Sequence, residues 1–394
     1  MEFLKHLNSI FARDTEGAVL IAEESTAWPK VSGDENDGGL GFDFKWNMGW
    51  MNDFLDYMQC DPYFRHDHYG ELTFSMLYAY SEKFVLVFSH DEVVHGKGSM
   101  AGKMPGDTQE KKFANLRTAY GFMMGHPGKK LLFMGQDFGQ MDEWNEKESL
   151  EWGLLKYDIH SQMRDYVKAL NHLYRTQPAL YKMDYEPEGF EWINCTYNDE
   201  NIVIFERKTD KLEETLLFVC NFVSVEHEKF RLGVPFAGKY KEILNSDDEA
   251  FGGAGTVHNK AVRSKKKPLH GFEQSITITL PPMSVLYFEV PAKRTRKTAE
   301  EKAAEKAAPK KASKTAKAEE KAPAKRGRKP KAEAAPAEEK APAKRGRKPK
   351  AEAAPAEEKA PAKRGRKPKA EKAAEPAEKP ARKPRAKKAD KAEK

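Results

Sequence analysis

The fold of this chain is decided by the stretch GAVLIAEE at residues 17–24, an unbroken apolar run that ends in two carboxylates. A continuous apolar run of this length is typical of a strand that is buried on both faces, as in a parallel sheet. Two more runs have the same form, FVLVFSHDE at residues 84–92 and KLLFMGQD at residues 130–137. We therefore expect parallel strands at residues 17–22, 84–88 and 131–134, and a fourth strand around residues 42–46.

Amphipathic stretches lie before, between and after these runs. Apolar residues recur at helical spacing over residues 3–11, 113–123 and 163–174, which predicts helices that bury one face. Strands that alternate with helices describe an α/β barrel or a doubly wound sheet. In a (β/α)8 barrel, the active site is built at the carboxyl ends of the strands, where this sequence places polar residues.

After about residue 178 the pattern changes to short apolar runs separated by turns. These runs occupy residues 202–205, 216–220, 240–244, 275–280 and 285–290. Strands at this spacing predict a small all-β sandwich. We therefore expect an α/β domain over residues 1–178 and an all-β domain over residues 179–292.

The remaining segment, residues 293–394, has a different composition. It contains no aromatic residue and no Val, Ile, Leu or Met, and it holds 37 of the 68 basic and 16 of the 61 acidic residues. Its net charge is +21, whereas residues 1–292 carry −14, and together they give the formal +7. A segment without apolar side chains larger than Ala cannot offset the entropy of ordering its backbone, so we expect it to be disordered.

Cysteine content and hydropathy restrict the class of protein. The three cysteines, Cys60, Cys195 and Cys220, are odd in number and widely spaced, which argues against a disulfide framework or a zinc site and indicates a reducing compartment. The first residues lack the pattern of a secretory signal. No run approaches about 18 apolar residues, so no membrane span is predicted. We expect a cytoplasmic enzyme that requires no metal and no other cofactor.

Two carboxylates occupy positions where catalytic residues are expected. Glu23 and Asp91 each follow a predicted buried strand, which would place both at the mouth of a barrel. Cleavage of a glycosidic bond uses a pair of carboxyl groups, one as proton donor and the other as nucleophile or stabiliser of an oxocarbenium-like centre. From spacing alone, carboxylates that cap a following helix are the more common alternative.

The residues around these carboxylates resemble a known family. AEEST at residues 22–26 and SHDEVVHGK at residues 89–97 are similar to the third and fourth signature regions of branching enzymes in the alpha-amylase superfamily. The resemblance extends through GLGFDFKWNMGWM at residues 39–51 and GHPGKKLLFMGQ at residues 125–136. It covers essentially all of residues 1–292.

This resemblance implies a fold, a substrate and roles for named residues. The fold would be the second half of a (β/α)8 barrel followed by a C-terminal β-sandwich. Such enzymes cut an α-1,4 linkage in a glucan and re-form it as an α-1,6 branch by retaining transglycosylation. Glu23 would be the general acid/base, Asp91 would stabilise the transition state, and His90 would hydrogen-bond the glucosyl unit. A general acid needs a raised pKa, which a dry site with neighbouring carboxylates would provide.

Tryptophans are the other candidates for substrate binding. Trp46 and Trp50, and further along the chain Trp144 and Trp152, have rings that could stack on sugar faces. The alternative is that these rings pack in the core, which is the commoner use of aromatic residues at such spacing.

The sequence also departs from the family. The family's nucleophilic Asp lies in a Gly-Phe-Arg-x-Asp-Ala type of segment, and the printed sequence contains none. Only about four of the eight strands of a barrel are identified, which would leave two sheet edges and apolar surface uncovered. We therefore expect the chain alone to be inactive or nearly so, and either to need a polypeptide that supplies the missing N-terminal half or to be a truncated gene product.

The basic segment carries a 19-residue repeat with the motif RGRKP. Its arginines are Arg326, Arg328, Arg345, Arg347, Arg364 and Arg366. The motif resembles an AT-hook, which lays arginines into the minor groove of A/T-rich DNA, but the Lys before each Pro departs from the AT-hook core. Binding of any polyanion through counterion release and a solubilising tail without a partner are the other interpretations. The alternative function is therefore a nucleic-acid or polyanion-binding protein whose enzyme-like part is catalytically dead.

Overall fold

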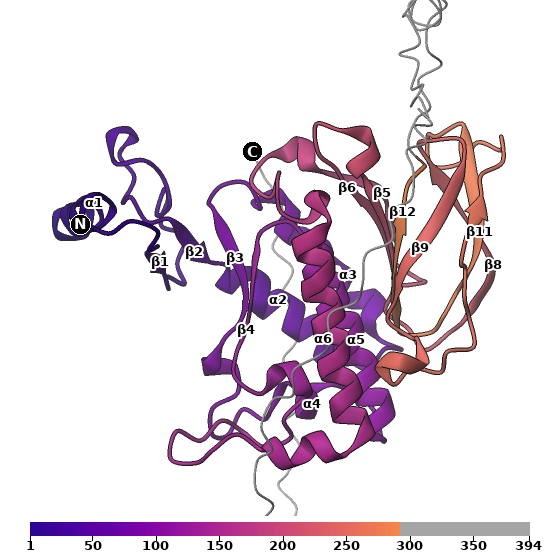
Figure 1. Ribbon diagram of the computed structural model, residues 1–394, viewed down its shortest axis with the longest axis horizontal. Helices are drawn as coiled ribbons and strands as arrows, with labels where there is room; N and C mark the ends of the chain where they lie inside the picture. Colours follow the sequence, from indigo (N-terminus) through magenta and orange to yellow (C-terminus); the bar gives the residue numbers. More distant parts are fainter. Residues whose placement is uncertain (292–394) are drawn as a thin grey trace, which may run out of the picture. The chain divides into compact units, whose positions relative to one another are not determined.

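The structure, a computed structural model, describes residues 1–291 of the chain (Figure 1). The predicted disordered segment and its six repeat arginines lie outside the described residues. Among the described residues, no helix combines the length and the apolar character that crossing a bilayer requires.

The α/β part is built on a four-stranded parallel sheet with the strand order β1-β2-β3-β4. Its strands are β1 (Ile21–Ala22), β2 (Phe44–Trp46), β3 (Phe84–Phe88) and β4 (Lys129–Leu132). The four predicted strands are thus present and parallel. β3 is buried at every position, as its unbroken apolar run predicts.

The run that contains β1 is not buried, and this corrects the prediction. Only Ala22 of residues 17–22 is buried, while Val19 is 52% and Ile21 is 42% exposed. The reason is the position of β1 at the edge of the sheet, where it pairs with β2 alone among the described strands. The apolar side chains that a buried strand would cover therefore face outward.

Within residues 1–291, six α-helices accompany the sheet. They are α1 (Glu2–Asp14), α2 (Met48–Gln59), α3 (Tyr69–Thr73), α4 (Met100–Lys103), α5 (Gln109–Gly125) and α6 (Asp158–Thr176). Side-chain caps fix two of the helix starts: Asn47 accepts from the Trp50 amide at 2.9 Å, and Thr108 accepts from the Lys111 amide at 3.4 Å. The helices predicted around residues 3–11, 113–123 and 163–174 are present as α1, α5 and α6, but α1 buries only Asn8, and its apolar residues Phe3, Leu7 and Ile10 are exposed.

In the described part of the chain, eight strands form the all-β part in two antiparallel sheets. They are β5 (Phe190–Tyr197), β6 (Ile202–Arg207), β7 (Leu216–Asn221), β8 (His227–Val234), β9 (Lys239–Asn245), β10 (Val262–Arg263), β11 (Gln274–Leu280) and β12 (Ser284–Glu289). One sheet has the order β10-β9-β12-β7-β6-β5, and the other pairs β11 with β8. Apolar side chains of both sheets share one core that includes Ile204, Leu232 and Ile276. The five predicted runs are all strands.

The α/β part and the all-β part are packed directly together. The Tyr287 hydroxyl on β12 donates to the Gly121 carbonyl on α5 at 2.6 Å. At Gly125 a Cβ atom would lie 2.7 Å from the ring of Phe218 on β7, so this end of α5 approaches the sheet as only glycine allows. The Phe218 ring in turn stacks on Phe205 at a centroid distance of 4.7 Å.

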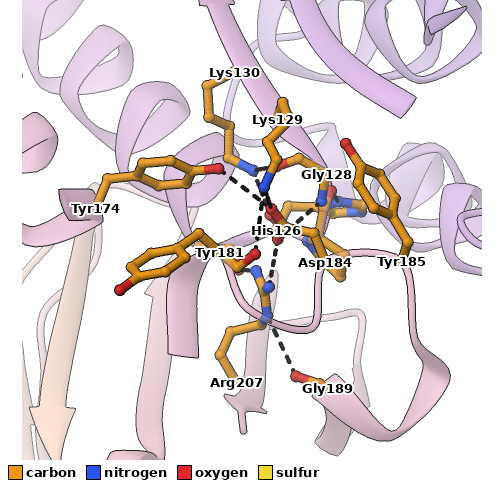
Figure 2. Close-up of polar contacts among 12 residues, drawn as sticks. His126, Gly128, Lys129, Lys130, Tyr174, Tyr181, Asp184, Tyr185, Gly189 and Arg207 are labelled. Carbon is orange, nitrogen blue, oxygen red and sulfur yellow. Dashed lines mark hydrogen bonds and ion pairs between the residues drawn. The ribbon is translucent and has the colours of Figure 1, made fainter. Parts of the chain in front are cut away.

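A buried carboxylate joins the two parts electrostatically (Figure 2). Asp184 has no exposed side-chain surface, and it pairs with Arg207 on β6 at 2.7 Å and with Lys129 on β4 at 2.8 Å. The Tyr174 hydroxyl on α6 donates to the same carboxylate at 3.2 Å. Burial raises the pKa of Asp184, but the positive charges of Lys130, Arg207 and Lys129 outweigh this effect and hold the pKa below its usual value.

The imidazole of His126 lies beside this network and is also buried. Its Nδ1 donates to the Pro127 carbonyl at 2.9 Å, which leaves Nε2 to accept from the Ser75 hydroxyl at 3.1 Å. The pKa of His126 is lowered to about 3, mainly by burial and also by the charges of Lys130 and Arg207, which together outweigh the raising effect of the Pro127 hydrogen bond. The folded protein therefore holds this ring neutral at neutral pH.

Replacing the buried carboxylate by an amide should destabilise the fold strongly. In Asp184→Asn, Arg207 and Lys129 lose their buried counter-charge, and breaking such a pair costs about 3–5 kcal/mol of unfolding free energy. Urea denaturation followed by circular dichroism measures this change. Glu289→Gln is the matched control, because its 3.4 Å pair with Lys241 is exposed and should contribute below about 1 kcal/mol. Equal effects of the two substitutions would contradict this account of the junction.

The neutral His126 should make the fold sensitive to acid. The unfolded chain binds a proton at this ring below about pH 6.5, whereas the folded chain does not until about pH 3. The unfolding free energy should therefore fall as the pH drops from 6.5 toward 3, by up to about 1.4 kcal/mol per pH unit from this group.

The measurement compares urea midpoints at pH 7 and pH 5 for the unchanged chain and for His126→Asn, whose amide can still donate to Pro127. The variant should show a shallower loss of stability. His172→Asn, at an exposed histidine, should keep the original slope. An unchanged slope in His126→Asn would show that other groups carry the acid sensitivity.

Candidate active site

Two parallel strands bring the predicted site residues together. Glu23 directly follows β1, and Asp91 lies in the 3-10 turn His90–Glu92 that follows β3. The Ser89 hydroxyl caps this turn by accepting from the Asp91 amide at 3.2 Å. Because parallel strands end at the same edge of a sheet, one side-chain N or O atom from each of Glu23, His90 and Asp91 falls within 4.8 Å of the others. We call these three side chains the carboxylate–histidine cluster.

His90 is held in place by a polar contact on each ring nitrogen and by aromatic neighbours. Its Nε2 lies 3.2 Å from the Asp91 carboxylate, and its Nδ1 lies 3.3 Å from the Ser89 hydroxyl. Rings of three aromatic residues surround the imidazole at centroid distances of 5.8–6.4 Å: Phe133, Trp144 and Trp46. The imidazole therefore has a fixed orientation beside Asp91.

The neighbouring Glu24 has a structural partner. Its carboxylate pairs with the buried Lys45 ammonium at 2.7 Å and accepts from the Thr26 amide at 2.8 Å. Burial raises the pKa of Glu24, but these contacts with Lys45 and Thr26 outweigh it and lower the pKa. Within residues 1–291 no hydrogen bond or ion pair engages the Glu23 carboxylate, so of the two adjacent glutamates Glu23 is available for chemistry.

The dry surroundings predicted for the general acid are not formed by the described residues. Glu23 and Asp91 are both exposed, and His90 is half-buried. The cause is again the edge position of β1, which leaves one side of the cluster without a covering element among residues 1–291.

The two tryptophans predicted to bind substrate differ in their placement. Trp46 is half-buried at the end of β2, beside His90. Trp50 is only 1% exposed, and its ring packs on Phe54 at 5.1 Å and on Phe88 at 5.5 Å. The prediction that Trp50 contacts a sugar is therefore wrong. α2 turns this residue into the core, and the core-packing alternative holds for it.

A residue missed by the sequence analysis shapes the loop after Asp91. The Glu143 carboxylate accepts from the backbone amides of Gly96 and Gly98 at 2.9 and 2.7 Å. The Trp144 amide donates to the Val93 carbonyl at 2.8 Å, which brings the Trp144 ring to His90. These contacts join segments more than 40 residues apart, and no local pattern in the sequence signals them.

The cluster offers two carboxylates and an imidazole at the end of a parallel sheet. This set can donate a proton, accept one and stabilise positive charge, which is what glycosidic bond cleavage requires. The same oxygen and nitrogen atoms are also of the kind that ligate divalent cations. The acid–base interpretation requires no cation.

Comparison with known proteins relates the chain to glucan-acting enzymes. Residues 192–291 match the family of the alpha amylase C-terminal all-beta domain. A 1,4-alpha-glucan branching enzyme of Halothermothrix orenii is 48% identical over 289 residues, which are 73% of this chain and 46% of that protein. The branching enzyme of Bacillus cereus strain Q1 is 49% identical over 286 residues, which are 72% of this chain and 44% of that protein. The chain thus spans less than half the length of these relatives.

Solved structures resemble the chain in fold. An alpha-amylase of Geobacillus thermoleovorans, complexed with acarbose, has a TM-score of 0.51 at 12% identity, with 74% of this chain and 57% of that chain covered. A pullulanase of Bacillus acidopullulyticus has a TM-score of 0.51 at 13% identity, with 73% of this chain and 36% of that chain covered. At such identities the likeness concerns the fold alone.

The resemblance predicted from residues 22–26 and 89–97 is confirmed by the relatives at 48–49% identity. Over about three quarters of its length, this chain is similar in sequence to 1,4-alpha-glucan branching enzymes, and its all-β part matches the alpha amylase C-terminal all-beta domain.

Proposed function

We propose that residues 1–291 form the C-terminal half of a branching-enzyme catalytic unit that acts on α-1,4-glucan chains. In this proposal residues 1–178, with the sheet β1–β4, are half of a (β/α)8 barrel, and residues 179–292 are its C-terminal β-sandwich. The observation that supports it best is the carboxylate–histidine cluster at the carboxyl ends of β1 and β3. Barrel enzymes build their active sites at this end of the strands.

Each member of the cluster has a proposed role in retaining transglycosylation. A nucleophilic carboxylate attacks the anomeric carbon, the C1–O4 bond breaks, and Glu23 gives its proton to the departing O4. Glu23 then removes the proton from the 6-hydroxyl of an acceptor chain. This oxygen attacks C1 and releases the nucleophile, which completes the α-1,6 linkage. Asp91 stabilises the oxocarbenium-like centre, and His90 hydrogen-bonds the glucosyl unit, with Trp46 beside it.

The nucleophile in this scheme comes from a polypeptide segment other than those printed in the sequence. The exposed apolar side chains near β1 support this part of the proposal: Phe3 is 75%, Leu7 is 43% and Val19 is 52% exposed. Such a group of apolar side chains marks a surface that another element covers. A segment that completed the sheet beyond β1 would bury these side chains and would also enclose Glu23.

The amino-terminal half of a relative should restore branching activity to this chain. The 394-residue chain alone should show almost no loss of amylose–iodine absorbance and form almost no α-1,6 linkages. Addition of a polypeptide that corresponds to the first half of the Halothermothrix orenii branching enzyme should produce both signals. Clear activity of the chain alone would mean that another carboxylate serves as nucleophile, and the proposed mechanism would be wrong.

Substitutions in the cluster test the roles of its members in the restored enzyme. Glu23→Gln and Asp91→Asn should each lower the branching rate by roughly 10²–10⁴-fold, because each removes a charge or proton that the transition state uses. Glu213→Gln is the control, since this exposed glutamate of the all-β part lies outside the cluster. Undiminished activity of Glu23→Gln would exclude it as the general acid/base.

Binding of DNA or another polyanion through residues 293–394 is the alternative function. It depends entirely on residues outside the described part of the chain and stays a prediction from the sequence.

A further inference from the structure

The segment that follows β4 is anchored to the loop that carries His90 and Asp91. One oxygen of the Glu143 carboxylate, Oε1, accepts from both the Gly96 and the Gly98 amide, at 2.9 and 2.7 Å. Both glycines have positive φ angles, of 85° and 79°, and a left-handed backbone of this kind can direct nearby amides toward a common anion. The Glu143 carboxylate therefore serves as the anion that this loop binds.

A second carboxylate holds the same segment from the other side. Glu151 accepts from the backbone amides of Met141 and Asp142 through one oxygen, Oε2, at 3.1 and 3.0 Å. Earlier in the segment, the Gln136 carbonyl accepts from the Tyr120 hydroxyl of α5 at 3.0 Å. Hydrogen bonds to an ionised carboxylate are roughly twice as strong as bonds between neutral groups. The segment after β4 is therefore held at several points along its length.

These anchors bring the Trp144 ring against His90. The Trp144 amide donates to the Val93 carbonyl at 2.8 Å, which fixes the backbone on which the ring is carried. The ring meets the His90 imidazole edge-on at a centroid distance of 6.0 Å, and it meets Phe133 at 5.1 Å. The small cavity that Val93 and Trp144 help to line has about 10 Å³ of free space, the lower limit for one water molecule. The two segments are thus closely packed beside the imidazole.

We propose that Glu143 and Trp144 are positioning residues for His90 and Asp91. Glu143 holds the loop after β3 to the segment after β4. Trp144 keeps the imidazole in the orientation in which its Nε2 lies 3.2 Å from the Asp91 carboxylate. Glu143 and Trp144 act through this loop and do not contact the glucan. The effect on catalysis rests on the proposed function, because it assumes that His90 and Asp91 serve branching.

The nuclear magnetic resonance signal of His90 tests the positioning in the full chain alone. Histidine Cε1 is labelled with carbon-13, and the His90 signal is assigned by its loss in His90→Asn. Glu143→Ala removes the acceptor of both glycine amides, so the His90 signal should shift and broaden. Glu143→Gln should keep the signal near its original position, because both amides bond to a single oxygen that Gln retains. Glu146→Ala, at an exposed glutamate of the same segment, should leave the signal unchanged.

The branching rate of the chain with the added amino-terminal half tests the consequence for catalysis. Glu143→Ala and Trp144→Ala should each lower the rate at saturating amylose by about 10–100-fold, because a small displacement of catalytic groups has an effect of this size. The KM for amylose should stay within about twofold. Trp144→Phe keeps an aromatic ring beside His90 and should recover most of the rate. Circular dichroism checks that each variant is folded.

The outcomes separate this inference from the proposed function. An unchanged His90 signal in Glu143→Ala would overturn the inference, whatever the branching rate. A raised KM with an unchanged rate at saturation in Trp144→Ala would mean that the ring contacts the glucan, and this result would also overturn it. If the unchanged chain with the added half shows no branching, the proposed function fails, and the His90 signal still decides whether Glu143 positions the imidazole.

Discussion

The attraction between one buried carboxylate and the cations around it fixes how the described part of the chain is assembled. Asp184 follows α6 and reaches Lys129 on the parallel sheet and Arg207 on the antiparallel sheet. The buried charges of Asp184 and Arg207 are tolerated only when they are paired and hydrogen-bonded, so the segments that carry them have one acceptable arrangement. Burial, together with the nearby charges of Lys130 and Arg207, lowers the pKa of His126 and keeps its ring neutral. Around this point α5 lies close enough to the antiparallel sheet that glycine is required at the contact.

Within residues 1–291, the parallel sheet is well covered at β3 and little covered at its open edge, β1. At β3 the strand is covered on both faces, and the residues that follow it are held by caps, aromatic rings and the Glu143 carboxylate. At β1 the chain has an apolar sequence but little covering. In the carboxylate–histidine cluster, His90 and Asp91 are held by neighbouring residues, whereas Glu23 is held by fewer contacts. This difference explains why the described residues bring the two carboxylates close together but leave them exposed.

The sequence predicted those features that depend on neighbouring residues. The apolar run of β3, the helical spacing of α5 and α6 and the carboxylates after two strands were all identifiable, and the strands β6, β7, β9, β11 and β12 followed from their apolar content. β5 and β8 were missed because charged and polar residues interrupt them. The sequence could not show which of Trp46 and Trp50 is buried, because this depends on the residue at which β2 ends and α2 begins. The network of Asp184 joins residues 23 and 55 positions apart, and no local pattern encodes such a contact.

The shortness of β1 affects how this protein associates with other molecules. An edge strand with many unpaired amides and carbonyls recruits the strands of neighbouring molecules, and this is a common route to aggregation. β1 has only two residues, Ile21 and Ala22, so it presents few such groups in spite of its apolar side chains. Ladder formation between copies is therefore disfavoured. A molecule that covered this edge would contact mainly the side chains around α1 and β1 and few backbone groups.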